Sequence, residues 1–421
     1  MALALLGLFL WHLFFVPRAP LDMLALLAAL PAIIAAKAMR RPIRTPIDGP
    51  MLIYAGLTVL SALVHRTQFS PVILNVEPIP AWQPAAHALV LVVYFWGATA
   101  LLASAGRVNI AMTAIVLCIS VLGILATYNH LIAGFDVRLL NYALLSQWSG
   151  YPELGLLFVL AVPFPVALAV VSPSRLVVVA SALVALALVG DVAGVYSRGA
   201  NVGLAVTGVM LLALEIRKLH GTRLLRVALV GAVVLAGLLA AGKLPTRALR
   251  QFGTGSYYTS NTTGAYESRL SMWVRASEMI RDHPWLGVGP GNYSDAMATV
   301  YAKPGDPLLY RFHAHNMLIQ VAAESGIAAL LAFLLIWQRL LTRLAGLCAR
   351  NQNGVLAMGL FGALASLLSR GLGDQFLSGL RTSDRMSVLL WTLFAAAAAL
   401  ARGASRENED VAQMGLSRER G

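Results

Sequence analysis

The sequence predicts an all-α fold, a polytopic membrane bundle of about twelve transmembrane helices with a large, mostly helical loop on one face. Hydrophobic residues make up 58% of the 421 residues and charged residues only 12%, which is more apolar surface than a soluble domain can bury. The apolar residues form separate segments near the spanning length of about 20 residues. One connection, residues 245–315, is much longer than the others and has helical patterns of its own.

Several of the twelve apolar segments are short, and the first and last are the least regular. The first segment has no basic n-region and no small-residue cleavage site, so we predict that it is a retained helix rather than a signal peptide. Internal prolines are compatible with membrane helices. The predicted spans are residues 2–16, 21–39, 47–64, 85–105, 108–134, 151–171, 176–195, 199–215, 224–244, 316–337, 355–373 and 386–401.

The net charge of +13 would suggest a nucleic-acid partner in a soluble protein. Here we assign most of it to membrane topology and to contact with anionic lipids, and expect no nucleic acid. Arginine and lysine are concentrated in alternate short connections, which places those connections and both termini in the cytoplasm. The organisation that follows is spans 1–9 over residues 1–244, an outer loop over 245–315, spans 10–12 over 316–401, and a disordered cytoplasmic tail over 402–421.

The outer loop is predicted to be a folded unit rather than a flexible connection. Leu270, Trp273, Val274, Ser277 and Ile280 recur at helical spacing, and the following Pro284 ends that helix. GVGPGNY then indicates a tight glycine-rich turn, and SDAMATVYA a second short helix with Ser294 as its cap. Long ordered loops on a rigid scaffold often carry function.

The outer face should be poor in arginine, yet four arginines are predicted there. They lie near membrane boundaries or within the folded loop, where a surplus of guanidinium groups indicates an anionic ligand such as a phosphate. Each could instead extend to lipid headgroups, and Arg269 could lie on a solvated helix face. The four arginines are Arg198, Arg269, Arg311 and Arg370, with Asp374 as a nearby acid.

A histidine pair precedes the tenth span in the stretch RFHAHNMLIQVAAESG. An imidazole titrates near pH 6.5, so His315 could serve as a base, and a helix N-terminus favours its neutral form. Alternatively, His315 or Asn316 only caps the helix. His313 is expected on another side of the chain in a supporting role, and Glu324 as a buried, paired structural acid. Neither the histidines nor the two cysteines have the spacing of a metal site, so we expect no metal.

Four motifs in order resemble the O-antigen ligase and polymerase superfamily of bacterial envelope glycosyltransferases. They are S-R-G-A (197–200), E-S-R-L-x-x-W (267–273), H-P-W-L-G-V-G-P-G-N-Y (283–293) and H-x-H-N-x-L-x-Q-x-x-x-E-S-G (313–326). The resemblance is specific over about residues 180–340. The ligase branch has a histidine followed by asparagine, serine or glutamine, then nine residues, then Gly-x-x-[Gly/Thr/Tyr]. His315, Asn316 and Gly326 fit that pattern, whereas Ala329 departs from it.

The resemblance implies a function and its residues. Arg198 and Arg269 match the two functional arginines of the family, and His315 matches its histidine. The implied donor is O-antigen polysaccharide on undecaprenyl diphosphate, and the implied acceptor is a sugar hydroxyl of lipid A–core. The site would face the periplasm from the inner membrane, amid membrane lipids. We expect an inverting displacement without metal or cofactor, since diphosphate is a good leaving group.

Three alternatives stay open on the sequence alone. An O-antigen polymerase or a protein O-oligosaccharyltransferase would share the donor chemistry and differ in the acceptor. A transporter or flippase of an anionic lipid-linked substrate would be expected to have internal repeats and charges at mid-membrane, and neither is evident in the sequence. A structural envelope protein would not need a loop with histidine and arginine.

Overall fold

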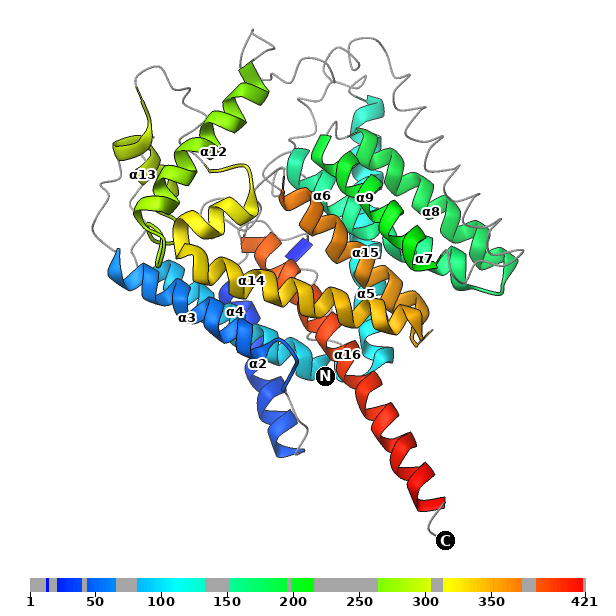
Figure 1. Cartoon of the computed structure of the whole chain (residues 1–421). Helices are drawn as coiled ribbons and strands as arrows, with labels where there is room; N and C mark the ends of the chain where they lie inside the picture. Colours follow the sequence, from blue (N-terminus) through cyan, green and yellow to red (C-terminus); the bar gives the residue numbers. More distant parts are fainter. Residues whose placement is uncertain are drawn as a thin grey trace.

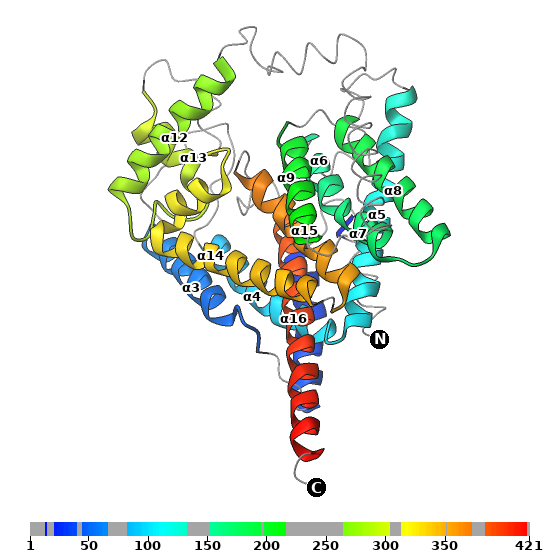
Figure 2. The same ribbon diagram turned by 45° about the vertical axis from the view of Figure 1, so that its right-hand side comes forward.

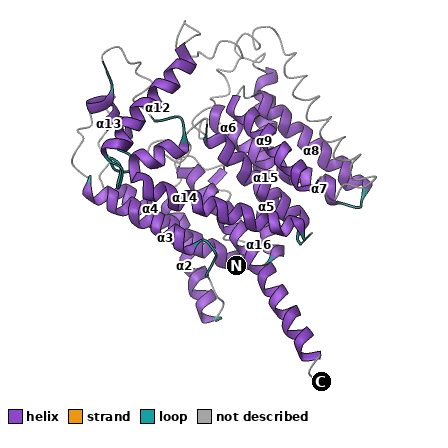
Figure 3. Cartoon of the chain, in the orientation of Figure 1, coloured by secondary structure: helices purple, strands orange, loops and turns teal. Residues whose placement is uncertain are grey.

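The computed structural model describes residues 13–14, 21–39, 44–65, 82–132, 151–194, 198–215, 264–303, 313–350, 352–372 and 384–418. Within these ranges every regular element is helical and no strand occurs, so the all-α prediction is confirmed (Figure 3).

Seven helical segments in the described ranges are long and apolar enough to cross a membrane, which makes the chain a multi-pass membrane protein. They come from α4 (Trp82–Leu101), α5 (Ala105–Ile132), the consecutive helices α6 (Tyr151–Ala161) and α7 (Pro163–Val171), α8 (Arg175–Gly194), α14 (Met317–Ala349), α15 (Gly354–Gly371) and α16 (Asp384–Arg418).

Three shorter apolar helices coincide with further predicted spans: α2 (Leu21–Ala38), α3 (Asp48–Val64) and α9 (Arg198–Glu215). Predicted span 224–244 lies outside the described residues, as does span 2–16 apart from Leu13 and Phe14.

Helix α14 lies at the centre of the bundle and packs against α3, α15 and α16 (Figure 1). Trp337 of α14 is 1% exposed, and its ring contacts Phe333 and Phe394 edge to face. Helix α15 packs against α7 and α9 as well as α14, so it connects α14 to α7 and α9.

The outer loop contains α12 (Gly264–Asp282), α13 (Tyr293–Ala296) and a π-helical turn (Met297–Tyr301). Figures 1 and 2 show α12 and α13 on the side of the molecule opposite the C-terminal end of α16. This unit has its own small core, which includes Met272, Met279 and Tyr293 and also takes in Ala314 and Ala323 from the region around the start of α14. The predicted folded unit is therefore present in the described part of the loop.

Two details of the loop prediction are wrong. Helix α12 ends before Pro284 as predicted, but its buried face is formed by Met272, Ala276 and Met279, while Val274 is 47% exposed. Methionine and alanine are as apolar as the residues of the predicted face, so periodicity alone could not choose between the two faces. In addition, Asn292 rather than Ser294 occupies the N-cap position of α13.

Residues 402–418 differ from the expected disordered tail, because α16 continues as one helix to Arg418. The segment contains no proline, and eight of its 17 residues are arginine, glutamate, alanine or glutamine, which favour helix. Its polarity indicates solvation, but polarity does not prevent a helix from continuing beyond its apolar part.

Candidate active site

The start of α14 is fixed by Asn316, which is 9% exposed. Its Oδ1 accepts hydrogen bonds from the backbone N–H groups of Leu318 (3.0 Å) and Ile319 (3.1 Å), so Asn316 is the N-cap. One of the two capping alternatives is thereby decided, since the cap of α14 is Asn316 and not His315.

The Asn316 side chain also connects α14 to the end of α15. Its Nδ2 donates to the backbone oxygen of Leu372 at 3.0 Å. Arg370, two residues earlier in the last turn of α15, is 5% exposed. The predicted supporting arginine therefore lies beside the start of α14, at the end of the bundle where the histidines are.

Helix α9 runs antiparallel to α15 and begins at this same end. A Cβ on Gly203 would lie 3.8 Å from the Cβ of Arg370, and Thr207, one turn later, bonds Ser366 at 2.5 Å. Arg198 is the first residue of α9, five residues before Gly203, and its backbone is described. Its position on α9 is thus about 7.5 Å, or one and a half turns, beyond the level of Arg370.

Helix α12 reaches the histidine segment through Trp273. The Trp273 Nε1–H donates to the backbone oxygen of Ala314 at 2.9 Å, directly before His315. Arg269, whose backbone is described, precedes Trp273 by four residues and so lies one turn away on the same face of α12. The helix positions of Arg198, Arg269 and Arg370 thus all lie close to the His315 segment.

The two histidines are close together, and the expectation that His313 lies on another side of the chain is wrong. Their ring centroids are 4.0 Å apart. His315 has φ +46°, a left-handed conformation that is uncommon for residues other than glycine. This turn of the chain brings the His313 ring beside the His315 ring. The remaining predicted residues, Arg311 and Asp374, lie outside the described residues.

The glycine-rich turn binds to a break in α14. Gly326 has φ +87° and ψ +170°, so the helix is interrupted there. The Ile327 N–H donates to the backbone oxygen of Pro284 at 2.8 Å. In return, Ala323 O accepts from Val288 N at 2.8 Å and Glu324 O accepts from Gly289 N at 3.0 Å.

The glycines of this turn allow the two backbones to approach closely. Gly287 has φ +64°, and a Cβ on it would lie 2.4 Å from the carbonyl carbon of Glu324. The third and fourth sequence motifs therefore form one structural unit. The tight glycine-rich turn predicted from GVGPGNY is confirmed, with positive φ at Gly287, Gly289 and Gly291, whereas the sequence did not predict the break at Gly326.

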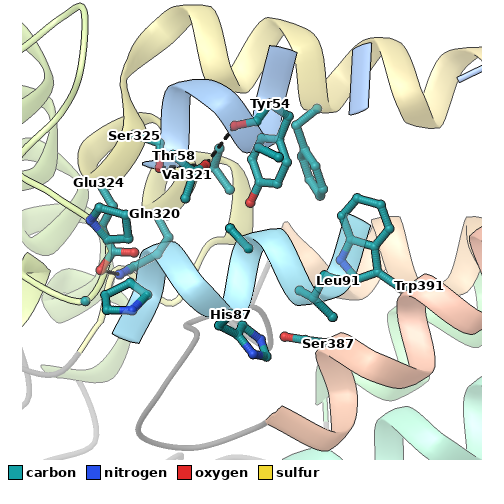
Figure 4. Close-up of a pocket in the computed structure, with 16 residues that line it drawn as sticks. Tyr54, Thr58, His87, Leu91, Gln320, Val321, Glu324, Ser325, Ser387 and Trp391 are labelled. Atoms are coloured by element: carbon teal, nitrogen blue, oxygen red, sulfur yellow. Dashed lines mark hydrogen bonds between the residues drawn. The ribbon is translucent and has the colours of Figure 1, made fainter. Parts of the chain in front are cut away.

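A pocket with several polar side chains in its lining lies next to the glycine-rich turn, between α3, α4, α14 and α16 (Figure 4). Its described lining does not include His315 or Arg370, so the pocket is not the place where the predicted catalytic groups meet. Glu324 is buried there and accepts a hydrogen bond from the Tyr293 N–H at 3.4 Å, as expected of a paired structural acid. The polar lining consists of Tyr54, Thr58, His87, Gln320, Glu324, Ser325, Ser387 and Trp391.

Comparison with known proteins identifies the same region. Residues 182–334 match the family described as O-antigen ligase. This part of the chain is thus similar to O-antigen ligases. The matched range contains α9, α12, the glycine-rich turn and the first part of α14, and with them Arg198, Arg269 and His315. A search of curated proteins found no match to the chain.

The match to the O-antigen ligase family supports a glycosyltransferase-like enzyme that acts on lipid-linked polysaccharide in a membrane. Among the residues that the structure describes, no group of three or more His, Cys, Asp or Glu side chains is arranged to hold a metal ion. Near the start of α14, the described side chains of the candidate site carry imidazole, guanidinium and amide groups.

Proposed function

We propose that the chain is an inverting glycosyltransferase that moves O-antigen polysaccharide from undecaprenyl diphosphate to a sugar hydroxyl of lipid A–core. The observation that carries the proposal is the convergence of four helices at one end of the bundle. The starts of α9 and α14, the end of α15 and one turn of α12 meet there through contacts of Asn316, Trp273 and Gly203.

The arginines would bind the donor. Arg198 at the start of α9 and Arg269 on α12 would hold the diphosphate, and their fixed positive charge would stabilise the negative charge that grows on it as the anomeric bond breaks. Arg370, buried in the last turn of α15, adds a third guanidinium to the same end of the bundle. The apolar faces of the surrounding helices would accommodate the polyprenyl chain.

His315 would act as the general base. The acceptor hydroxyl oxygen attacks the anomeric carbon, its proton passes to the imidazole, and the bond from the anomeric carbon to the diphosphate oxygen breaks with the electron pair leaving on the diphosphate. A single displacement of this kind inverts the anomeric configuration. Asn316 supplies the helix cap, and the strained backbone of His315 is of a kind found at functional sites.

The orientation in the membrane is part of the proposal. We place the α12–α13 unit in the periplasm and the C-terminal end of α16 in the cytoplasm of an inner-membrane protein. The opposite locations of these elements support this orientation, as does the concentration of arginine in the connections assigned to the cytoplasm (Figure 2).

The decisive experiment compares a strain that lacks the chain with one that carries the His315→Ala variant. We expect lipid A–core without O-antigen in both, while lipid-linked polymer accumulates at normal chain length and the variant still inserts. Normal attachment of polymer in the variant would remove His315 from the mechanism. Lipid A–core that carries single repeat units would instead identify a polymerase.

A further inference from the structure

The residue directly before His315 is held through both of its backbone polar groups. The backbone oxygen of Ala314 accepts the Trp273 Nε1–H at 2.9 Å, and the backbone N–H of Ala314 donates to Gln320 Oε1 at 2.8 Å. Ala314 is 0% exposed and its bond to Gln320 is buried, so losing that bond would leave a backbone group without solvent as a substitute. Trp273 comes from α12 and Gln320 from α14.

Glu324 determines which way the Gln320 amide points. Gln320 Nε2 donates to Glu324 Oε1 at 2.9 Å, one turn further along α14 (Figure 4). An amide has a donor end and an acceptor end, so fixing the donor end on a carboxylate leaves the oxygen end for Ala314. The backbone oxygen of Glu324 in turn accepts from Gly289 N at 3.0 Å and from Ser61 Oγ at 2.9 Å, so its position is well determined.

His315 is the strained residue between two fixed neighbours. Ala314 is tethered as described, and Asn316 bonds Leu318, Ile319 and Leu372. Between them His315 takes φ +46°, a conformation that is strained in a non-glycine residue and persists where the surroundings over-determine it. The tethers on both sides provide that restraint.

We propose that Gln320 and Glu324 are positioning residues for His315, and that Trp273 connects the same residue, Ala314, to the arginine-bearing helix α12. Trp273, Gln320 and Glu324 together form the Ala314 tether. Arg269 lies one turn from Trp273, so the tether sets the separation between the diphosphate-binding arginine and the base. The assignment rests on the proposed function in taking His315 as the base.

The kinetic test uses Gln320→Leu in purified protein with lipid-linked donor and lipid A–core acceptor. Without the tether, His315 is misplaced in the transition state while the donor still binds. We expect kcat to fall about 10- to 100-fold and the donor KM to change less than about twofold. Gln338→Leu is the matched control, since Gln338 lies exposed on the same helix, and its activity should equal that of the wild type.

Three further variants keep the test independent of the folding of one protein. Glu324→Gln retains an oxygen that can accept from Gln320 and should keep more activity than Glu324→Leu. Trp273→Phe removes the indole donor, keeps an aromatic ring, and should lower kcat in the same way as Gln320→Leu. An unchanged kcat in folded Gln320→Leu and Trp273→Phe, or a loss confined to KM, would overturn the assignment.

A measurement without substrate separates the tether from the proposed function. Hydrogen exchange at the Ala314 amide should be slow in the wild type and in Gln338→Leu, and at least about tenfold faster in Gln320→Leu. Equal exchange in all three proteins would refute the tether. If the wild type transfers no polymer but Ala314 shows this pattern, the proposed function fails and the tether stands.

Discussion

The substitution Gly326→Ala tests the break in α14 most directly. At φ +87° and ψ +170° the residue lies in a region that is almost restricted to glycine, so an alanine there costs about 1–3 kcal/mol. Its Cβ would also lie 2.1 Å from the backbone oxygen of Trp285. A backbone oxygen cannot rotate away as a side chain can, so the glycine-rich turn has to move off the helix.

Moving the turn affects three hydrogen bonds between it and α14. Each contributes about 0.5–1.5 kcal/mol net, so together with the backbone strain the expected loss of unfolding free energy is about 2.5–7.5 kcal/mol. The bonds at risk are Ile327 N to Pro284 O, Val288 N to Ala323 O, and Gly289 N to Glu324 O.

The assay is thermal unfolding of the purified protein in detergent, with Gly56→Ala as the matched control. Gly56 lies in α3, which packs against α14, and a Cβ on Gly56 would meet nothing within 4 Å. Gly56→Ala should leave the Tm unchanged or raise it slightly, since alanine is favoured over glycine in a helix by about 0.5–1 kcal/mol. A Gly326→Ala protein with the Tm of the Gly56→Ala protein would refute the reasoning.

Four other outcomes are expected. Asn316→Ala should lower the Tm and lose about 1–3 kcal/mol of unfolding free energy, because the cap and the bond to Leu372 disappear together. Arg198→Lys should lose most transfer activity if two parallel hydrogen bonds to the diphosphate matter, and a fully active variant would favour headgroup contact instead. Transfer should continue in excess chelator, and its loss would contradict the metal-free mechanism. Burial lowers the pKa of His65 below its ordinary value of 6.5, and the neighbouring His283 lowers it further. The unfolded chain therefore takes up the proton first as the pH falls. The Tm should therefore drop below about pH 6.5 more steeply in the wild type than in His65→Gln, and parallel curves would contradict this assignment.

Local features of the loop and the helix start were predictable because their causes are local. Pro284 cannot continue α12, the glycines of GVGPGNY permit positive φ, and an asparagine before an apolar run is a good N-cap. Each of these effects depends on a few neighbouring residues, so it can be inferred from composition and spacing. The same reasoning left the cap open between His315 and Asn316, since both are polar and adjacent.

The contacts that assemble the site were not predictable in this way. Trp273 and Ala314 are 41 residues apart in the chain, and Asn316 and Leu372 are 56 apart. Hydropathy and periodicity give the existence of helices but not which helices are neighbours. Gln320 was present in the fourth motif, but its bond to Ala314 depends on the left-handed turn at His315, which the sequence does not indicate.

The break at Gly326 explains why the third and fourth motifs depend on each other. In an uninterrupted helix the Ile327 N–H would donate to Ala323 O, and Glu324 O would accept from Ala328. With the helix broken, Ile327 bonds Pro284 O instead, and the two freed carbonyl oxygens accept from Val288 and Gly289. Unpaired backbone groups are costly in a membrane protein, so the broken helix is stable only with the turn in place, and the turn is ordered only against the broken helix. Because Glu324 and its side-chain bond to Gln320 lie at this junction, a change in the distant HPWLGVG turn should displace His315 without any contact to it.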